Sequence, residues 1–234
     1  MLAILRREFS AYFRSPIGYI YLAVFYIFSG FFFFTNNLYS GYSSITGVYS
    51  SLFSIIMFLI PILTMRLMSE DKKQKTDQAL LTAPISLFSL VMGKFLAALC
   101  VFCMGLAVTL VYAFVIAIFT TVAWSVVFGN LIGTILLATA LIAIGMFIST
   151  LTENQVIAAV GGFAVMLFLM LIDNLKNVVT NTLLQKIVTG VSFYERYTGF
   201  VMGKFNYADA VFYLSVAAIF IFLTIRVIER RRWS

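Results

Sequence analysis

The chain has 234 residues, of which 62% are hydrophobic and only 11% are charged. Its charged residues gather in short stretches that alternate six times with long apolar ones, which excludes a water-soluble domain and predicts a chain that crosses a lipid bilayer. The absence of histidine excludes His-based catalytic triads and most zinc sites.

The first 15 residues are too short and too charged to span a membrane. Their apolar side chains share one face of a helix, which predicts an amphipathic helix lying in the cytoplasmic interface. The apolar face holds Leu2, Leu5, Phe9, Tyr12 and Phe13, and the opposite face holds Arg7, Ser10 and Arg14. A simple positively charged anchor for the first span is the alternative interpretation.

Six apolar stretches are long enough to cross the membrane as helices, for which about 20 residues are needed. They cover residues 16–37, 50–68, 93–119, 124–150, 156–172 and 210–228. Pro16 takes the first helical position of the first span, and Pro61 predicts a kink in the second. Because spanning helices satisfy their own backbone hydrogen bonds, we expect an all-α integral membrane fold in which residues 1–234 form one domain.

The distribution of Lys and Arg predicts the orientation, because cytoplasmic loops carry the excess of basic residues. With the N-terminus in the cytoplasm, 12 of the 16 basic residues lie on the cytoplasmic side. An even number of spans then places both termini in the cytoplasm. The formal charge of +7 is explained by these basic flanks, so we expect no nucleic acid partner. We expect no cleavable signal peptide either, because the first apolar stretch lacks a small-residue cleavage site.

Charged residues in the spans are few and lie near the span ends. Arg66 lies near the cytoplasmic end of the second span, from which its side chain is expected to reach the water interface. Asp173 and Asp209 lie at the outer ends of the fifth and sixth spans. Gly129 and Gly133 form a G-x-x-x-G pattern, which allows close helix contact either inside the bundle or in a dimer.

Residues 69–90, between the second and third spans, form the most distinctive cytoplasmic segment. Ser69 can cap the start of a short polar helix, and Glu70 and Asp71 would then fall in its first turn. Pro84 would end that helix. A short capped polar helix between two spans is typical of a docking element for a soluble partner, although an ordinary solvated loop fits the same charges.

Residues 173–209 form the longest extracytoplasmic segment. An amphipathic helical pattern runs through Leu183, Leu184, Ile187, Val188 and Val191. The aromatic residues that follow, which we expect at the membrane surface as an aromatic belt, are Phe193, Tyr194 and Tyr197.

Residues 64–98 resemble the first cytoplasmic loop of the type-2 ABC exporter permeases. The shared pattern is an acidic residue after the second span, a polar helix ending in Leu-Leu, a Thr-x-Pro, and Gly-Lys-Phe entering the third span. The matching residues are Glu70, Leu80, Leu81, Thr82, Pro84, Gly93, Lys94 and Phe95. The opening REFSAYFRSPIGYI resembles the N-terminus of the small gliding-motility-type permeases of this family.

This resemblance implies the permease subunit of an ATP-driven exporter in a bacterial cell membrane. The polar helix would be the coupling helix, which fits a groove on a separate ATP-binding subunit. Its contact residues would be Ser69, Glu70, Asp71, Lys72, Lys73, Thr76, Asp77, Leu80, Leu81 and Pro84. The N-terminal helix would be the connecting helix beside it, with Arg6, Arg7, Phe9, Phe13 and Arg14. Short re-entrant or surface helices would cap the outer mouth.

The partners follow from the same resemblance. Two ATP-binding subunits would carry ATP and Mg²⁺, because this chain has no phosphate-binding motif of its own. A second copy of the chain, or a related permease, would complete the membrane unit within the lipid. We expect no catalytic, metal-binding or cofactor-binding residue in this chain.

Export of an amphiphilic substrate is the favoured function, since no charged pair lies at the middle of a span. The alternative is a subunit that passes ATP-driven movement to an auxiliary extracytoplasmic partner without export. A membrane enzyme is disfavoured, because only Glu70, Asp71 and Asp77 among the acidic residues lie close together in the sequence.

Overall fold

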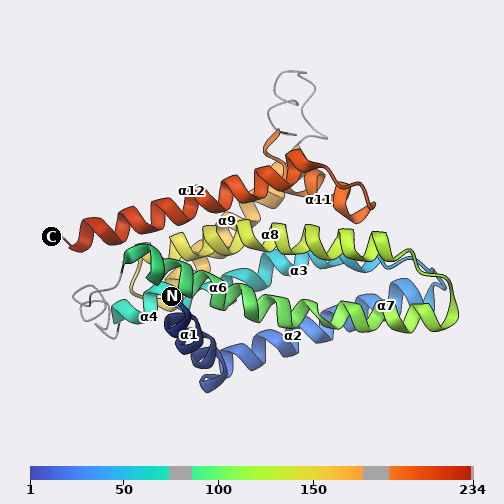
Figure 1. The fold of residues 1–234 in the computed structure, drawn as a ribbon, viewed down its shortest axis with the longest axis horizontal. Coiled ribbons are helices and arrows are strands. Elements are labelled where there is room, and N and C mark those ends of the chain that lie inside the picture. The colour runs from blue at the N-terminus through green and yellow to red at the C-terminus, as the bar shows by residue number, and fades with distance from the viewer. Residues whose placement is uncertain (74–85, 176–189, 233–234) are drawn as a thin grey trace.

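The computed structural model describes residues 1–73, 86–175 and 190–232, and this part of the chain contains helices and no strand. Figure 1 shows an elongated bundle in which the long helices run side by side. The helices are α1 (Leu2–Arg14), α2 (Pro16–Phe33), the π-helix η1 (Phe34–Tyr39), α3 (Thr46–Thr64), α4 (Arg66–Lys73), α6 (Leu87–Leu106), α7 (Val108–Phe119), α8 (Trp124–Leu151), α9 (Gln155–Leu175), α11 (Phe193–Val201) and α12 (Tyr207–Arg232).

Six helices in the described ranges are long and apolar enough to cross a membrane, which confirms the six predicted spans. They cover Pro16–Tyr39, Thr46–Lys73, Leu87–Phe119, Trp124–Leu151, Gln155–Asp173 and Tyr207–Arg230. The second span extends further into the 69–90 segment than the sequence predicts, and the third begins inside that segment. Pro16 stands at the start of α2, as predicted.

α8 lies at the centre of the bundle and packs against α12, α3, α11, α9, α6 and α4 (Figure 1). Its buried face is rich in small residues, among them Ala138, Ala140, Ala143 and Gly145. In a membrane the hydrophobic effect does not drive helices together, so close van der Waals packing of this kind stabilises the bundle. A Cβ atom at Gly145 would overlap the side chain of Thr64 on α3.

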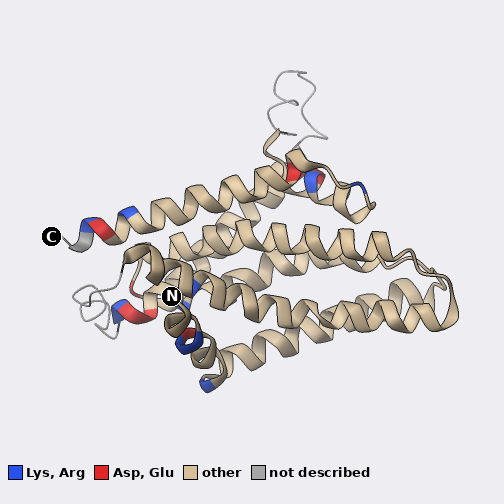
Figure 2. Ribbon diagram, in the orientation of Figure 1, with Lys and Arg blue, Asp and Glu red and all other residues tan. Residues whose placement is uncertain are grey.

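Charged side chains gather at two places in the described chain, leaving the middle of the long helices almost free of charge. Figure 2 shows one group around α1, α4 and the end of α12, where both termini lie, and a second group around α11. This arrangement fits a bilayer, because a charge in the middle of a spanning helix costs about 2.5–3.5 kcal/mol on insertion scales.

The second span is broken near its C-terminal end. The sequence predicts a kink at Pro61, and the structure has a break four residues later, at Met65, between α3 and α4. Proline lacks the N–H group that would bond to the carbonyl oxygen four residues earlier, so Pro61 weakens the turn before it; the N–H of Met65 still bonds to the carbonyl oxygen of Pro61 at 2.9 Å. The joint at Met65 thus lies inside the second span, before its end at Lys73.

α11 packs one face against α8, α9 and α3, while Tyr194 and Glu195 on its other face are exposed. The prediction of an aromatic belt is therefore wrong for Phe193 and Tyr197, which are 3% and 0% exposed, whereas Tyr194 is 37% exposed. The G-x-x-x-G pattern of α8 provides the space: Gly133 meets the side chain of Phe200, so the pattern serves internal packing. The helical pattern of residues 183–188 lies outside the described residues.

A methyl group at Gly133 would overlap Phe200, whereas one at Gly129 would have ordinary contacts at 3.7 Å. We predict that Gly133→Ala destabilises the protein by about 1–3 kcal/mol through overpacking. The matched control, Gly129→Ala, should leave the midpoint of thermal unfolding in detergent unchanged or slightly raised. Equal midpoints for the two variants would contradict the packing of α11 on α8.

Candidate functional site

The N-terminal helix forms as predicted, but its packed face differs from the prediction. Ile4 and Tyr12 are the buried residues of α1, which packs mainly on α6 and α2, while Leu2 is 78% exposed. Two glycines allow this close approach: a Cβ at Gly93 would lie 2.8 Å from Ile4, and one at Gly18 would lie 2.6 Å from the carbonyl oxygen of Tyr12. α1 is thus fixed to the starts of two spans.

Tyr12 anchors α1 to the second span. Its hydroxyl group donates a hydrogen bond of 2.7 Å to the carbonyl oxygen of Leu63, two residues before the break at Met65. Burial raises the pKa of Tyr12 above its usual value, although the nearby Arg66 acts in the opposite direction. The hydroxyl therefore remains protonated and keeps donating at any physiological pH.

Arg66, at the start of α4, is buried against α1, so the expectation that its side chain reaches the water interface is wrong. The guanidinium lies 5.4 Å from the centre of the Tyr12 ring and donates to the carbonyl oxygen of Ala11 at 3.3 Å and to the hydroxyl of Ser15. It also forms an ion pair of 2.7 Å with Glu70, one turn further along α4. These contacts join α4 to the C-terminal end of α1.

Lys94, on α6, is the most buried of the charged residues that join α1, α4 and α6, at 1% exposure. Its ammonium group lies 3.1 Å from a carboxylate oxygen of Glu8 on α1 and 2.7 Å from one of Asp71 on α4. One positive charge between two carboxylates therefore holds three helices together. Removing one partner of a buried ion pair is strongly destabilising, because it leaves the other charge without a counter-charge.

Ser149, near the end of α8, closes the helix break. Its hydroxyl oxygen accepts hydrogen bonds of 3.1 Å from the backbone N–H groups of Met68 and Ser69, and it donates one of 2.9 Å to the carbonyl oxygen of Met65. The hydroxyl of Ser69 also bonds to Met65. One side chain thus satisfies backbone groups that the interrupted ladder leaves free, as membrane helices require.

The prediction that Ser69 caps a new helix is accordingly wrong. Ser69 is buried inside α4, so Glu70 and Asp71 do not lie in a first turn. The helix continues across the predicted cap because the side chains of Arg66 and Glu70 pair one turn apart. Among the described residues of this segment, Ser86 is an N-cap, and its hydroxyl accepts from the N–H of Ser89 at the start of α6.

The comparison with known families decides what kind of protein carries this cluster. The family model described as ABC-2 family transporter protein matches residues 2–232. The chain belongs to the ABC-2 transporter family. It is the permease subunit of an ABC transporter, a multi-pass membrane protein that associates with an ABC ATP-binding subunit. No curated protein matches the chain.

The structure brings together part of the predicted docking residues of the permease. Lys72 contacts the carbonyl oxygen of Thr150 at the end of α8, and Lys73 is exposed. Of the residues predicted for the connecting helix, Arg6, Arg7 and Arg14 are exposed, while the rings of Phe9 and Phe13 are half-buried and 5.2 Å apart. The remaining predicted residues, which lie outside the described residues, are Thr76, Asp77, Leu80, Leu81 and Pro84.

Four residues of this cluster escaped the functional prediction: Glu8, Tyr12, Lys94 and Ser149. Lys94 could have been found from the sequence, because a charged residue just inside an apolar span needs a partner of opposite charge. Ser149 and Tyr12 had none, since a single hydroxyl near a span end fits many roles. Their importance emerges only when the break at Met65 is located.

A second polar cluster of the permease holds α11 in place. Tyr197 lies with its hydroxyl 3.0 Å from that of Thr134 on α8 and 3.1 Å from the carbonyl oxygen of Tyr49 on α3. The amide of Asn130, in the orientation that satisfies its neighbours, donates to the last carbonyls of α11. Arg196 pairs with Asp209 on α12 at 2.6 Å. α11 is therefore bonded to three spans.

Lys94→Met should destabilise the permease by about 3–5 kcal/mol, because two nearby carboxylates lose their shared counter-charge. The midpoint of thermal unfolding in detergent measures this loss. Adding Glu8→Gln and Asp71→Asn to Lys94→Met should recover much of it. Lys204→Met, which removes an exposed lysine at the other end of the molecule, is the control, and an equal effect of both lysine variants would refute the buried network.

Ser149→Ala should lower the stability of the permease by about 1–3 kcal/mol, because two backbone N–H groups lose their acceptor. Thr139→Val is the matched control, since the Thr139 hydroxyl bonds only to Ile135 within α8. Hydrogen exchange at the amides of Met68 and Ser69 should accelerate in Ser149→Ala alone. Unchanged exchange at these two amides would contradict the role of Ser149.

Proposed function

We propose that the permease is the membrane subunit of an ATP-driven exporter, and that α1, α4 and the start of α6 receive movement from the ATP-binding subunit. The observation that carries this proposal is the buried position of Lys94 between Glu8 and Asp71. It joins the two segments that the family resemblance assigns to the connecting and coupling helices. Both segments lie at the end of the bundle that holds the termini (Figure 2).

Movement would pass from the docking segment into the spans by three contacts. α4 ends at Lys73, directly before residues 74–85. This segment contains the predicted docking residues Leu80 and Leu81. Displacement of α4 would pull α6 through Asp71 and Lys94, α1 through Arg66, and α8 through Ser149. Because these contacts are buried and directional, a small shift of α4 would be felt by several spans at once.

The assembly that this function requires contains two permeases, either two copies of this chain or this chain with a related one, and two ATP-binding subunits. ATP and Mg²⁺ would bind to those subunits. The complex would lie in a bacterial cell membrane with both permease termini in the cytoplasm, the side on which the positive-inside rule places most of the Lys and Arg residues.

An amphiphilic substrate suits the spans. The ion pairs of the described residues lie at the ends of the bundle, so the middle of the spans offers no charged site for a small ion (Figure 2). The second candidate is transmission of movement to an extracytoplasmic protein without export. The firm attachment of α11, through Arg196 and Tyr197, favours that candidate, because a rigid outer element can carry a load.

The first experiment is co-purification. The tagged permease is expressed with candidate ATP-binding subunits of the same genome, solubilised in mild detergent and purified through its own tag. We expect a stoichiometric complex that hydrolyses ATP. Leu81→Glu should abolish the complex while the permease still elutes as a single species, because a charge would enter the apolar contact.

Lys204→Glu, at the opposite end, is the control and should leave the complex intact. A permease that purifies without any ATPase, or a complex that tolerates Leu81→Glu, would overturn the proposed docking site. ATP-dependent loss of an amphiphile from proteoliposomes would support export. Crosslinks from residues 190–205 to an extracytoplasmic protein, without substrate-stimulated ATPase activity, would select the second candidate instead.

A further inference from the structure

The outer face of α1 carries two arginines that have no ion-pair partner among the described residues. These are Arg6 and Arg14, and both are exposed, whereas the neighbouring Arg7 pairs with Glu8. Glu8 is the only acidic residue of α1, and its carboxylate also contacts Lys94 on the inner side of the helix. The outer face therefore presents positive charge without a counter-charge of its own.

Aromatic rings lie beside these arginines and lead onto the first span. The rings of Phe9 and Phe13 are 5.2 Å apart, and Phe13 meets the ring of Tyr19 on α2 edge-on at 5.5 Å. Tyr19 and the next residue, Ile20, are 60% and 54% exposed on a helix that crosses the membrane. The row of rings on α1 thus continues onto an apolar surface that lies in the membrane.

The course of α1 places this face at the membrane surface. Figure 1 shows that α1 runs crosswise to the long helices, at the end of the bundle that holds both termini. The extended backbone of Ser15 turns the chain between α1 and α2, and the first span begins at the next residue, Pro16. α1 therefore lies where the span enters the bilayer, a level at which rings can reach the acyl chains while guanidinium groups stay among the headgroups.

Arginine at this level meets lipid phosphate groups. A guanidinium stays charged at any physiological pH and binds a phosphate through two parallel hydrogen bonds. A zwitterionic lipid carries a cation beside its phosphate, whereas an anionic phospholipid has a net negative charge, so unpaired arginines favour the anionic lipid. Arg6 and Arg14 are about 12 Å apart along the helix axis, which leaves room for one headgroup at each.

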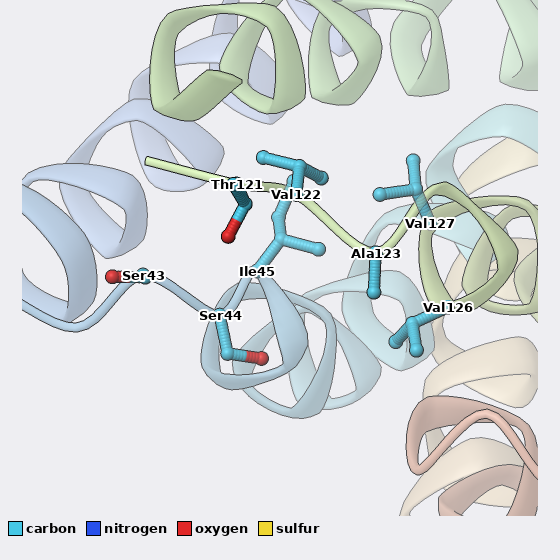
Figure 3. A pocket seen from close by; sticks show the side chains of 8 residues that line it. All are labelled: Ser43, Ser44, Ile45, Thr121, Val122, Ala123, Val126 and Val127. Atoms are coloured by element: carbon cyan, nitrogen blue, oxygen red, sulfur yellow. The ribbon is translucent and has the colours of Figure 1, made fainter. Parts of the chain in front are cut away.

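The opposite end of the first span lacks this chemistry. Residues 34–45 contain no Lys or Arg. A pocket of about 210 Å³ beside them is lined by the hydroxyl-bearing side chains of Ser43, Ser44 and Thr121 and by apolar side chains (Figure 3). Such a lining gives an anionic headgroup no counter-charge, so the charge distribution along the first span favours the face of α1.

We propose that the outer face of α1 binds anionic phospholipids, with Arg6 and Arg14 holding the phosphate groups and the rings of Phe9 and Phe13 contacting the acyl chains. The contacts of α1 with Lys94 and Arg66 are made by its inner face and its C-terminal end. The lipid site is therefore independent of the proposed docking of an ATP-binding subunit, and failure of one proposal leaves the other standing.

The test compares two photoreactive lipids in nanodiscs of phosphatidylcholine. One probe has the anionic phosphatidylglycerol headgroup and the other the zwitterionic phosphatidylcholine headgroup, and both carry the photoreactive group at the start of one acyl chain. Crosslinked peptides are quantified by mass spectrometry. At residues 2–20 we expect the anionic probe to label about five- to thirtyfold more, because each arginine near a lipid surface contributes a preference of about fivefold. Added salt should reduce this preference.

The double variant Arg6→Gln with Arg14→Gln should lower labelling of residues 2–20 by the anionic probe to the level of the zwitterionic one. Arg226→Gln is the matched control, because it removes an exposed arginine at the same end of the bundle whose charge Glu229 already compensates. It should leave the preference at residues 2–20 unchanged. Labelling of residues 34–45 should be the same in all variants.

Equal labelling of residues 2–20 by the two probes in the unaltered permease would overturn the proposal, whatever the variants do. A preference that survives the loss of both arginines would overturn it as well. Absence of labelling at these residues, or their protection in the complex with a co-purified ATP-binding subunit, would show that protein covers this face and would also refute lipid binding. Failure to capture such a subunit would count against the docking proposal alone.

Discussion

The need to compensate buried charge and backbone polarity governs the end of this permease that holds both termini. Lys94 is almost fully buried, and it is tolerable there because Glu8 and Asp71 approach it from two other helices. The same requirement explains why α1 lies where it does, since its carboxylate and the ring of Tyr12 complete contacts that the spans cannot make alone. In a lipid environment, the contacts that satisfy a buried polar group therefore also fix the position of the helix that carries it.

The break at Met65 is subject to the same requirement for hydrogen-bond partners. A helix interrupted in lipid must find other partners for its backbone groups, and here the hydroxyl of Ser149 provides them from α8. The chain belongs to the ABC-2 transporter family, and α4 directly precedes the segment that we expect to meet the ATP-binding subunit. The joint at Met65 therefore lies next to the expected docking segment. The chemistry of hydrolysis belongs to that partner in the proposed complex.

Hydropathy was sufficient to predict the six spans, because a run of about 20 apolar residues has few other uses. It could not predict that Ser69 lies inside a helix, since its capping preference is local whereas the pairing of Asp71 with Lys94 is tertiary. Nor could it separate Tyr194, which is exposed, from Tyr197, which is buried. That distinction depends on the space that Gly133 leaves for α11, a property of packing between helices far apart in the sequence.

The attachment of α11 has a mechanical consequence. Tyr197 and its neighbours connect α3, α8 and α11 through hydroxyl and carbonyl groups that water does not reach, and Asp209 adds α12. In hydrocarbon, a broken bond of this kind finds no substitute, so these helices resist being separated one at a time. The cluster around Lys94 ties α1, α4 and α6 together in the same way, so buried polar contacts resist the separation of single helices at both ends of the bundle.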